Sequence, residues 1–456
     1  MNTKELKHGL TPESIPQDWT RHIEECASNM SITLVCGAPF SGKSVFSRRL
    51  LNRYLTGHGK LAPALPSVYF LDIDSDQPEY NPHGQITLTL VREINLGPPF
   101  THPTTIPTSP SLNETIRSHP IPMQDTPNFI DHVISCVKDL FETYRKFQQR
   151  NPIVPLIINT PGWIYASHFD VLLRILSQTT PQRLVHIRDL DSIDEERAHK
   201  FHGLNVTASK HRIAVQEVST QWPILISSRT HTELRHMHML SYFHCTSKPD
   251  IMKHVYDSKP LSHSRPWEFC YEENKAFHQD FIGFLSLSEW VEPQHLFTAL
   301  NGSIIQVVET MDEDIQGLFG QLPRTIKYHI PYFEKGPDDA VKPLDPATSK
   351  LVCTALLRGW IPERRIAQLL VPKSHEALIY GLKPERTVFV FGCCDTPEWA
   401  FTEDAYNVAA ERTEREDPGA QLAIKPTKPQ PWVACAEEIG NMGYLNTVRR
   451  IRKFQQ

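Results

Sequence analysis

The sequence predicts an α/β fold, in which a parallel sheet flanked by helices is followed by a smaller mixed α+β C-terminal domain. Two observations support this prediction. Short apolar runs alternate with amphipathic segments up to about residue 245, as expected for strands joined by crossover helices. Beyond about residue 250, separated β-like runs replace that alternation. We therefore expect a lead-in segment at 1–30, a first domain at 31–248 and a C-terminal domain at 249–456.

The expected elements of the first domain follow from hydrophobic periodicity. Helices are predicted at Gln17–Ala27, Lys43–Leu55, Phe129–Phe147, His168–Leu176 and Glu233–His244. Strands are predicted at Ser31–Cys36, Pro66–Ile73, Pro155–Ile158, Arg183–Ile187 and Pro223–Ser227. The stretch 97–127 is rich in Pro, Thr and Ser, which predicts a loop or insertion without a core of its own.

The C-terminal domain is expected to be mixed. Its β-like runs are Phe281–Leu287, Ser303–Val308 and Thr387–Cys393. Between the last two, a helix is predicted over Pro346–Leu357, with Asp345 as its N-cap.

Composition narrows the class of protein. The 456 residues are 40% hydrophobic and 22% charged, as in a soluble globular protein. No apolar run approaches the ~18 residues that span a bilayer, and the polar N-terminus does not resemble a signal peptide. We therefore expect no membrane partner. Nine scattered cysteines without a CxxC pair predict a reducing, intracellular compartment.

A net charge of −5 argues against indiscriminate nucleic-acid binding. Any RNA contact would come from local basic patches, although an isolated patch of this kind is more often a solvated helix face. The patches are Arg145, Lys146 and Arg150, then Arg364 and Arg365, then Arg449, Arg450, Arg452 and Lys453.

A phosphate-binding loop is the strongest motif. Residues 37–44 (GAPFSGKS) satisfy G-x-x-x-x-G-K-[ST] between a predicted buried strand and an amphipathic helix. Backbone N–H groups and the helix N-terminus would face the phosphates, Lys43 the β- and γ-phosphates, and Ser44 a Mg²⁺ ion. This predicts a P-loop NTPase domain that binds ATP and Mg²⁺. The expected nucleotide-binding residues are Gly37, Ala38, Pro39, Phe40, Ser41, Gly42, Lys43 and Ser44.

Two carboxylates follow the second predicted strand. Asp72 and Asp74 share one side of that strand, at the sheet edge where parallel α/β folds bind ligands. One of them could hold Mg²⁺ through water, and the other could accept a proton from an attacking hydroxyl. Both roles suit phosphoryl transfer to an alcohol.

Several segments, in order, resemble the polynucleotide 5′-hydroxyl kinase family. Residues 71–88 (LDIDSDQPEYNPHGQITL) are similar to its D-x-D-x-G-Q-P-E-F segment. Residues 96–102 (LGPPFTH), 159–163 (NTPGW), 234–244 and 399–404 are similar to segments of its nucleolar, ribosomal-RNA-processing branch. The resemblance runs from about residue 17 to the end, where Gly443 to Arg452 match its closing signature.

The resemblance implies roles for individual residues. Asp74 would be the general base on an RNA 5′-hydroxyl, and Asp72 would help with Mg²⁺. Trp163 would stack on a terminal base, and Thr160 of the same clasp is also expected to contact RNA. Arg229 and Arg235 fall where the family has lid arginines, which would neutralise charge on the transferring phosphoryl group.

The resemblance also implies a setting. The chain would be a kinase of 5′-hydroxyl RNA in the processing of internal spacer 2 of pre-ribosomal RNA, in the nucleus and nucleolus. Its implied partner is the HEPN-fold endonuclease that cuts this spacer, and the basic stretch Arg449–Lys453 is a candidate docking element.

Three departures from the family support an alternative function. Asp76 replaces a family glycine, residues 164–168 lack a family G-x-G, and the family's β-rich N-terminal domain does not precede the P-loop at residue 37. The alternative is a catalytically weakened, ATP-binding scaffold of the same complex. A nucleoside kinase is a third hypothesis, but it explains neither the clasp nor the second domain. The histidines 231, 236, 238 and 244 are a candidate zinc site, although no metal is expected there.

Overall fold

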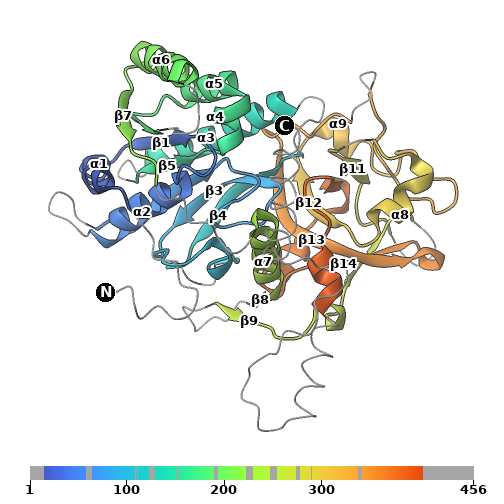
Figure 1. Ribbon diagram of the computed structural model, residues 1–456. Coiled ribbons are helices and arrows are strands. Elements are labelled where there is room, and N and C mark those ends of the chain that lie inside the picture. Colours follow the sequence, from blue (N-terminus) through green and yellow to red (C-terminus); the bar gives the residue numbers. More distant parts are fainter. Residues whose placement is uncertain are drawn as a thin grey trace, which may run out of the picture.

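Two sheets form the framework of the chain (Figure 1). The computed structural model describes residues 15–57, 64–107, 109, 111–122, 129–150, 154–188, 194–221, 230–246, 254–273, 278–288, 290–336 and 341–403. Among these, no helix combines the length and apolar character that crossing a membrane requires.

The first sheet has seven strands in the order β4-β3-β2-β5-β1-β6-β7. Strands β2, β5, β1, β6 and β7 are parallel, and β3 and β4 continue the sheet in antiparallel fashion. The strands are β1 (Ile32–Gly37), β2 (Val68–Asp72), β3 (Gln85–Val91), β4 (Glu114–Pro120), β5 (Leu156–Asn159), β6 (Arg183–Ile187) and β7 (Ala214–Val218).

Helices cover both faces of this sheet (Figure 1). Residues of α1 and α2 pack on one face, and residues of α3 to α6 pack on the other. The helices are α1 (Gln17–Ala27), α2 (Lys43–Thr56), α3 (Phe129–Arg150), α4 (Gly162–Ser167), α5 (Phe169–Thr179) and α6 (Asp194–His211).

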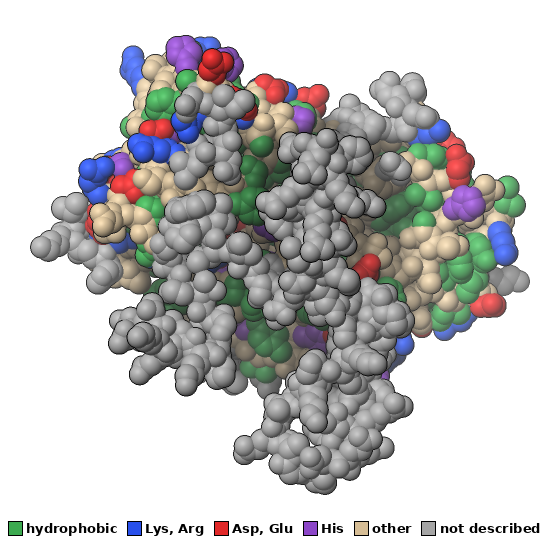
Figure 2. All heavy atoms as spheres, in the orientation of Figure 1, with side chains coloured by type: hydrophobic (Ala, Val, Ile, Leu, Met, Phe, Trp, Pro, Cys, Tyr) green, Lys and Arg blue, Asp and Glu red, His purple; other side chains and the backbone are tan. Residues whose placement is uncertain are grey.

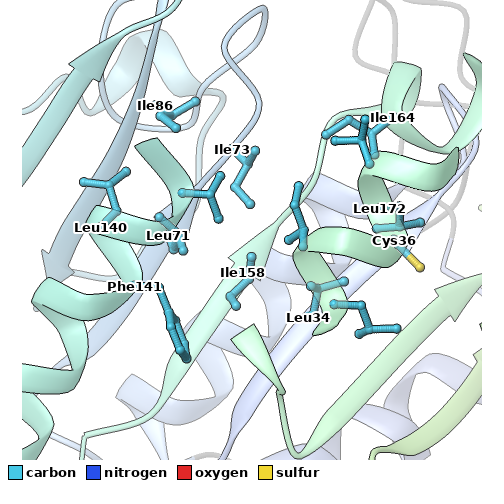
Figure 3. Packing of buried hydrophobic residues seen from close by; sticks show 14 of the residues in the cluster. Leu34, Cys36, Leu71, Ile73, Ile86, Leu140, Phe141, Ile158, Ile164 and Leu172 are labelled. Carbon is cyan, nitrogen blue, oxygen red and sulfur yellow. The ribbon is translucent and has the colours of Figure 1, made fainter. Parts of the chain in front are cut away.

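Alternation along the strands explains the two layers. In β1, Leu34 and Cys36 belong to the core under α3 to α6, whereas Val35 belongs to the core under α1 and α2. Figure 3 shows Leu34, Cys36, Leu71 and Ile158 among the side chains of the first of these cores. Because both faces are buried, the central strands are continuous apolar runs.

The second sheet has six strands in the order β10-β14-β13-β12-β15-β11, parallel only between β11 and β15. The strands are β10 (Trp267–Cys270), β11 (Phe284–Ser286), β12 (Ile304–Thr310), β13 (Ser349–Ile361), β14 (Ile366–Leu370) and β15 (Thr387–Phe391). The short helices α8 (Leu296–Leu300), α9 (Glu313–Gln316) and α10 (Glu376–Ile379) accompany it.

Helix α7 (His231–His244) lies between the two sheets (Figure 1). A capping box of Thr230 and Glu233 fixes its N-terminus. Met239 and Phe243 pack with side chains of the second sheet, and the hydroxyl of Tyr242 donates to the carbonyl of Thr354 at 3.2 Å. A small ladder of β8 (Cys245–Thr246) and β9 (Val255–Tyr256) follows α7. The helix therefore connects the two parts of the fold.

The mostly parallel sheet with flanking helices and the mixed second sheet confirm the predicted fold class. Most predicted elements are present, and the helix Gln17–Ala27 has the predicted bounds. The predicted strand Pro223–Ser227 lies outside the described residues. Helix α6 and strands β3 and β7 were not among the expected elements.

Two sequence predictions were wrong. The stretch 97–127, predicted as a loop or an insertion without a core of its own, contributes β4, which pairs with β3 of the first sheet. Pro346–Leu357 is not helical: Asp345 accepts the N–H of Ala347 in a turn, and β13 then begins at Ser349. The apolar residues of β13 alternate between two faces and pair with β12 and β14, so the period is that of a strand.

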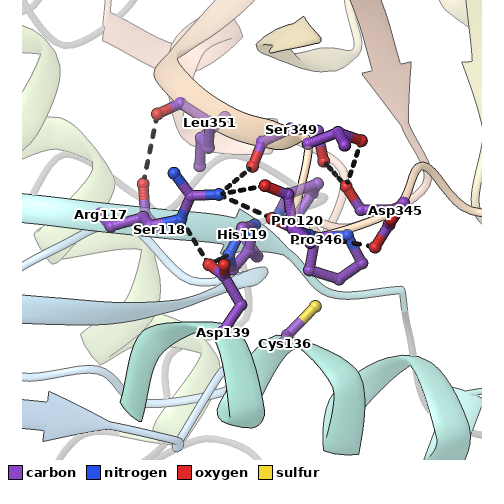
Figure 4. Close-up of polar contacts among 12 residues, drawn as sticks. Arg117, Ser118, His119, Pro120, Cys136, Asp139, Asp345, Pro346, Ser349 and Leu351 are labelled. Atoms are coloured by element: carbon purple, nitrogen blue, oxygen red, sulfur yellow. Dashed lines mark hydrogen bonds and ion pairs between the residues drawn. The ribbon is translucent and has the colours of Figure 1, made fainter. Parts of the chain in front are cut away.

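Arg117 of β4 joins the two parts of the fold (Figure 4). Its Nη2 donates to the carbonyls of Pro346 (2.7 Å) and Ser349 (3.0 Å), and its Nε pairs with Asp139 of α3. His119 also contacts Asp139, at 2.8 Å. One guanidinium therefore satisfies carbonyls of the second domain and a carboxylate of the first.

We expect Arg117→Met to lower the free energy of unfolding by about 2 kcal/mol, because it leaves the carbonyls and part of Asp139 without a donor. Denaturant titration measures this change. The exposed pair Arg174–Asp131 provides the control, since Arg174→Met should change stability by less than about 0.5 kcal/mol. Equal effects of the two substitutions would contradict the bridging role of Arg117.

Candidate active site

A cavity of about 670 Å³ opens at the C-terminal ends of β1, β2 and β5. The P-loop, the turn after β2, the start of α4 and the first turns of α7 contribute its lining. The lining residues are Pro39, Phe40, Gly42, Lys43, Ser44, Val45, Asp74, Asp76, Gln77, Pro161, Gly162, Trp163, Gln221, His231 and Arg235. The segments that the sequence singled out separately therefore converge on one site.

The P-loop forms one wall of the cavity. Five of the eight predicted nucleotide-binding residues line it, whereas Gly37, Ala38 and Ser41 do not. The ammonium of Lys43 is buried and donates to the carbonyl of Ala38 at 2.6 Å. Burial lowers the pKa of Lys43 to about 8, although the nearby Asp74 opposes this shift. A bound polyphosphate would raise this pKa again, because it favours the charged ammonium.

Asp72 and Asp74 occupy different environments. Both oxygens of the buried Asp72 accept hydrogen bonds, from the backbone N–H groups of Asp74 and Glu79 and the amide of Asn159. Burial and the Asp74 carboxylate raise the pKa of Asp72 to about 8. Asp72 does not line the cavity. Its hydrogen bonds instead stabilise the turn after β2, which carries Asp74.

Asp74 faces the cavity. Its Oδ1 accepts the N–H groups of Asp76 (3.2 Å) and Gln77 (3.0 Å), which orients the carboxylate. Burial raises the pKa of Asp74, and these hydrogen bonds and Lys43 oppose the shift. Asp76 also lines the cavity and is exposed, and it is not one of the described non-glycine residues with positive φ. Aspartate in place of the family glycine therefore costs no backbone strain.

Glu79 supports this turn and was missed by the sequence reasoning. Its buried carboxylate accepts two hydrogen bonds from Arg48 of α2, at 2.7 and 3.0 Å, and contacts His102 at 3.1 Å. Burial alone would raise the pKa of Glu79, but Arg48 and His102 outweigh it and lower the pKa to about 2. The resemblance contained the signal, because Glu79 and His102 lie in two of the segments that resemble the family, 71–88 and 96–102.

Trp163 of α4 lines the cavity beside the P-loop. Its ring lies 5.4 Å from that of Phe129, and its buried Nε1 has no hydrogen-bond partner within the described structure. A Cβ on Gly162 would lie 2.7 Å from the Cα of Pro39, so only glycine allows this approach to the P-loop.

The hydroxyl of Thr160 is buried and donates to the carbonyl of Val35 at 2.8 Å. Thr160 thus has a structural task in place of the predicted contact with RNA.

Helix α7 brings Arg235 and His231 to the cavity. Arg235 pairs with Asp395, and the ring of His231 lies 4.9 Å from that of Phe40. Phe40 is 62% exposed and has a φ of 61°, an uncommon conformation for a non-glycine residue. Arg229, the other predicted lid arginine, lies outside the described residues. Gln221 and Asp395 were not predicted, because no short motif marks them, and His231 was considered only as a candidate zinc ligand.

No group of three His, Cys, Asp or Glu residues lies close enough to hold a metal ion within the described ranges. Of the histidines considered for zinc, His231 faces the cavity, whereas His238 is buried and His244 pairs with Glu403.

Charged groups on the face seen in Figure 2 are interspersed: Lys and Arg side chains alternate with Asp and Glu and form no single large patch among the described residues there.

Comparisons with known proteins agree with this geometry. Residues 37–245 match the family model described as the mRNA cleavage and polyadenylation factor CLP1 P-loop. A protein of Gibberella zeae named polynucleotide 5′-hydroxyl-kinase GRC3 is 30% identical over 440 residues, which cover 90% of this chain and 58% of that protein. Its namesake in Emericella nidulans is 29% identical, over 89% of this chain and 54% of that protein. The chain thus spans less than two thirds of these relatives.

The same fold occurs in a solved structure. Clp1p, determined in complex with Pcf11p, matches this chain with a TM-score of 0.55 at 13% sequence identity. The match covers 83% of this chain and 80% of that one, so it includes both sheets.

Replacing Glu79 tests the support beneath the site. We expect Glu79→Gln to lower the free energy of unfolding at neutral pH by about 3 kcal/mol, because it leaves Arg48 without its buried counter-charge. The depressed pKa gives the sign of the pH dependence. Stability from Glu79 is present above its unfolded value of 4.5 and is lost as the pH falls through about 2.

The unfolding free energy of Glu79→Gln should therefore vary less between pH 4.5 and 2 than that of the original protein. Glu363→Gln, at an exposed carboxylate, is the control and should follow the original curve. Parallel curves for the original protein and Glu79→Gln would show that Glu79 is not the titrating support.

Proposed function

We propose that the chain transfers the γ-phosphate of ATP to the 5′-hydroxyl end of RNA, as the match of residues 37–245 to the CLP1 P-loop family model supports. One observation carries the proposal: Lys43, Asp74 and Trp163 line a single cavity. They supply a cation for phosphates, a proton acceptor and a surface on which a base stacks. Fungal relatives named polynucleotide 5′-hydroxyl kinases support the same reaction.

The P-loop end of the cavity suits a polyphosphate. Lys43 supplies a positive charge, and the backbone N–H groups at the N-terminus of α2 add the favourable end of the helix dipole. Ser44 presents a hydroxyl to the same cavity, a hard oxygen donor that fits Mg²⁺. This ion, when bound, neutralises charge that develops on the β- and γ-phosphate oxygens. Asp72 contributes by holding the turn that carries Asp74.

Asp74 is the proposed general base. Two N–H donors orient its Oδ1, and the carboxylate can then accept the proton of the RNA 5′-hydroxyl. The hydroxyl oxygen forms a bond to the γ-phosphorus as the bond between the γ-phosphorus and the β,γ-bridging oxygen breaks, and ADP leaves. The raised pKa of Asp74 favours this role, because the acid and base forms then lie closer in free energy at neutral pH.

Arg235 and Trp163 are proposed to fix the two substrates. Arg235, which lines the cavity, would neutralise charge on the transferring phosphoryl group, and Arg229 is assigned the same role from the family resemblance. Trp163 would stack on the terminal base and hold the 5′-hydroxyl near Asp74.

The proposed setting is processing of internal spacer 2 of pre-ribosomal RNA, in the nucleus and nucleolus. Segments similar to the nucleolar branch, such as 96–102 and 159–163, support this choice over the mRNA-cleavage branch. The proposed partner is the HEPN-fold endonuclease whose cut leaves a 5′-hydroxyl. The basic stretch Arg449–Lys453 remains a candidate docking element, and it lies outside the described residues.

One feature favours the alternative of a catalytically weakened, ATP-binding scaffold. Asp76 lines the cavity close to Asp74, so a second carboxylate faces the anionic phosphates. Against it stands the convergence of Lys43, Ser44, Asp74 and Arg235 on the same cavity.

Transfer of labelled γ-phosphate from Mg²⁺–ATP to a 5′-hydroxyl RNA oligonucleotide tests the proposal. We expect transfer by the original protein and a loss on the order of 10²-fold or more with Lys43→Ala and with Asp74→Asn. An oligonucleotide that already carries a 5′-phosphate is the acceptor control. Normal ATP binding without transfer would favour the scaffold, and Asp76→Gly would then be the first variant to examine.

Replacing Trp163 tests the stacking role. Trp163→Ala should raise the KM for the oligonucleotide by roughly 10- to 100-fold, since stacking contributes about 1–3 kcal/mol per base, and should leave the KM for ATP nearly unchanged. Tyr380→Ala removes an exposed aromatic ring from the second domain and is the matched control. An unchanged KM for the oligonucleotide in Trp163→Ala would rule out the clamp.

A further inference from the structure

The guanidinium of Arg235 is held by a residue far away in the sequence. Its Nε donates to Oδ2 of Asp395 at 2.7 Å, and its Nη2 lies 2.6 Å from the same oxygen. Nη2 also donates to the hydroxyl of Thr232 at 3.2 Å, one turn earlier in α7. Nη1 takes part in none of these contacts. Asp395 thus engages one edge of an arginine that lines the cavity.

Asp395 is itself fixed against the first domain. It follows β15, and its backbone N–H donates to Nε2 of His83 at 3.1 Å. The thiol of the preceding Cys394 donates to the carbonyl of His83 at 3.2 Å. Burial lowers the pKa of His83 to about 4, so its ring is neutral at neutral pH and Nε2 can accept.

The approach of this loop requires a glycine at residue 84. Gly84 has a φ of +81°, and a Cβ there would lie 2.3 Å from the carbonyl oxygen of Cys393 and 2.7 Å from Sγ of Cys394. Gln306 of β12 donates to the carbonyl of Gly84 at 2.9 Å. The loop after β15 therefore packs against His83 and Gly84, and this packing fixes the position of Asp395 next to the turn that follows β2.

We propose that Asp395 is a positioning residue, which holds the guanidinium of Arg235 in the lining of the phosphate cavity. This inference rests on the proposed function, and it makes the second domain part of the active site. Asp395 binds Nε and Nη2 and leaves Nη1 as the corner that can reach a phosphoryl oxygen.

Without Asp395, the guanidinium of Arg235 could pair with other carboxylates nearby. Asp74 and Asp76 line the same cavity and attract a cation. A guanidinium that pairs with Asp74 would block the proposed base. A guanidinium that pairs with Asp76 would no longer contact the transferring phosphoryl group. Since a displacement of about 1 Å can cost on the order of 10² in rate, a fixed counter-ion outside the cavity protects the geometry.

A double-mutant cycle on the complete chain tests the proposal. We expect Asp395→Ala to lower kcat by on the order of 10²-fold, with a much smaller change in the KM for ATP. Arg235→Ala should lower kcat at least as far, and the double variant should be no slower than Arg235→Ala alone, because the two residues act as one unit. Asp395→Glu should recover part of the rate. Glu385→Ala, at an exposed carboxylate of the second domain, is the control.

Additive losses in the double variant, or an Asp395→Ala rate equal to that of Glu385→Ala, would overturn the proposal while leaving the kinase activity established. If Asp395→Ala fails to give the thermal unfolding transition of the original protein, Asp395→Asn takes its place in the cycle. It keeps an acceptor oxygen and loses the charge.

A binding measurement separates this inference from the proposed function. If the original protein transfers no phosphate, the affinities for Mg²⁺–ATP and Mg²⁺–ADP are compared by calorimetry. A preference for ATP that both Arg235→Ala and Asp395→Ala abolish would uphold the positioning role. A preference that only Arg235→Ala abolishes would overturn it.

Discussion

The buried carboxylate of Glu79 determines how the phosphate-binding elements are arranged. It receives two hydrogen bonds from Arg48, which lies on α2 about one turn after the P-loop lysine. The carboxylate also contacts His102. The backbone N–H of Glu79 donates to the carboxylate of Asp72. One side chain thus joins the helix of the P-loop to the turn that carries the proposed base. A buried ion pair is an uncertain source of net stability, but it specifies one arrangement because any other leaves a charge unpaired.

The fold of the first domain was predictable because its signals are local. The apolar run of β1, the glycine-rich loop and the periodicity of α2 follow one another without interruption, so length and pattern define each element. Strand β13 was mispredicted because an Asp-Pro pair followed by mixed apolar residues suits a helix start as well as a turn before a strand. Tertiary pairing with β12 and β14 decided between them, and one sequence does not contain that pairing.

The site was predictable only in part for the same reason. Lys43, Asp74 and Trp163 belong to short motifs whose residue types carry the chemistry. Asp395 carries no such mark: it reaches Arg235 across 160 positions, because β15 and the loop after it pack on His83 and Gly84. Thr160 shows the opposite error, since a motif residue proved to be buried against β1. Motifs identify residues with suitable chemistry, and packing decides which of them face the ligand.

The charges in the cavity constrain how a polyphosphate can bind. Among the described lining residues, the cations Lys43 and Arg235 are matched by the carboxylates of Asp74 and Asp76. Asp395, which is not a lining residue, further neutralises the positive charge of Arg235. Net side-chain charge therefore gives little attraction for a triphosphate. The attraction must come from the N–H groups at the start of α2, and from a divalent cation that arrives with the nucleotide. A site balanced in this way would favour a phosphate that carries its own counter-ion over a free anion, and Mg²⁺–ATP, the proposed phosphate donor, is such a ligand.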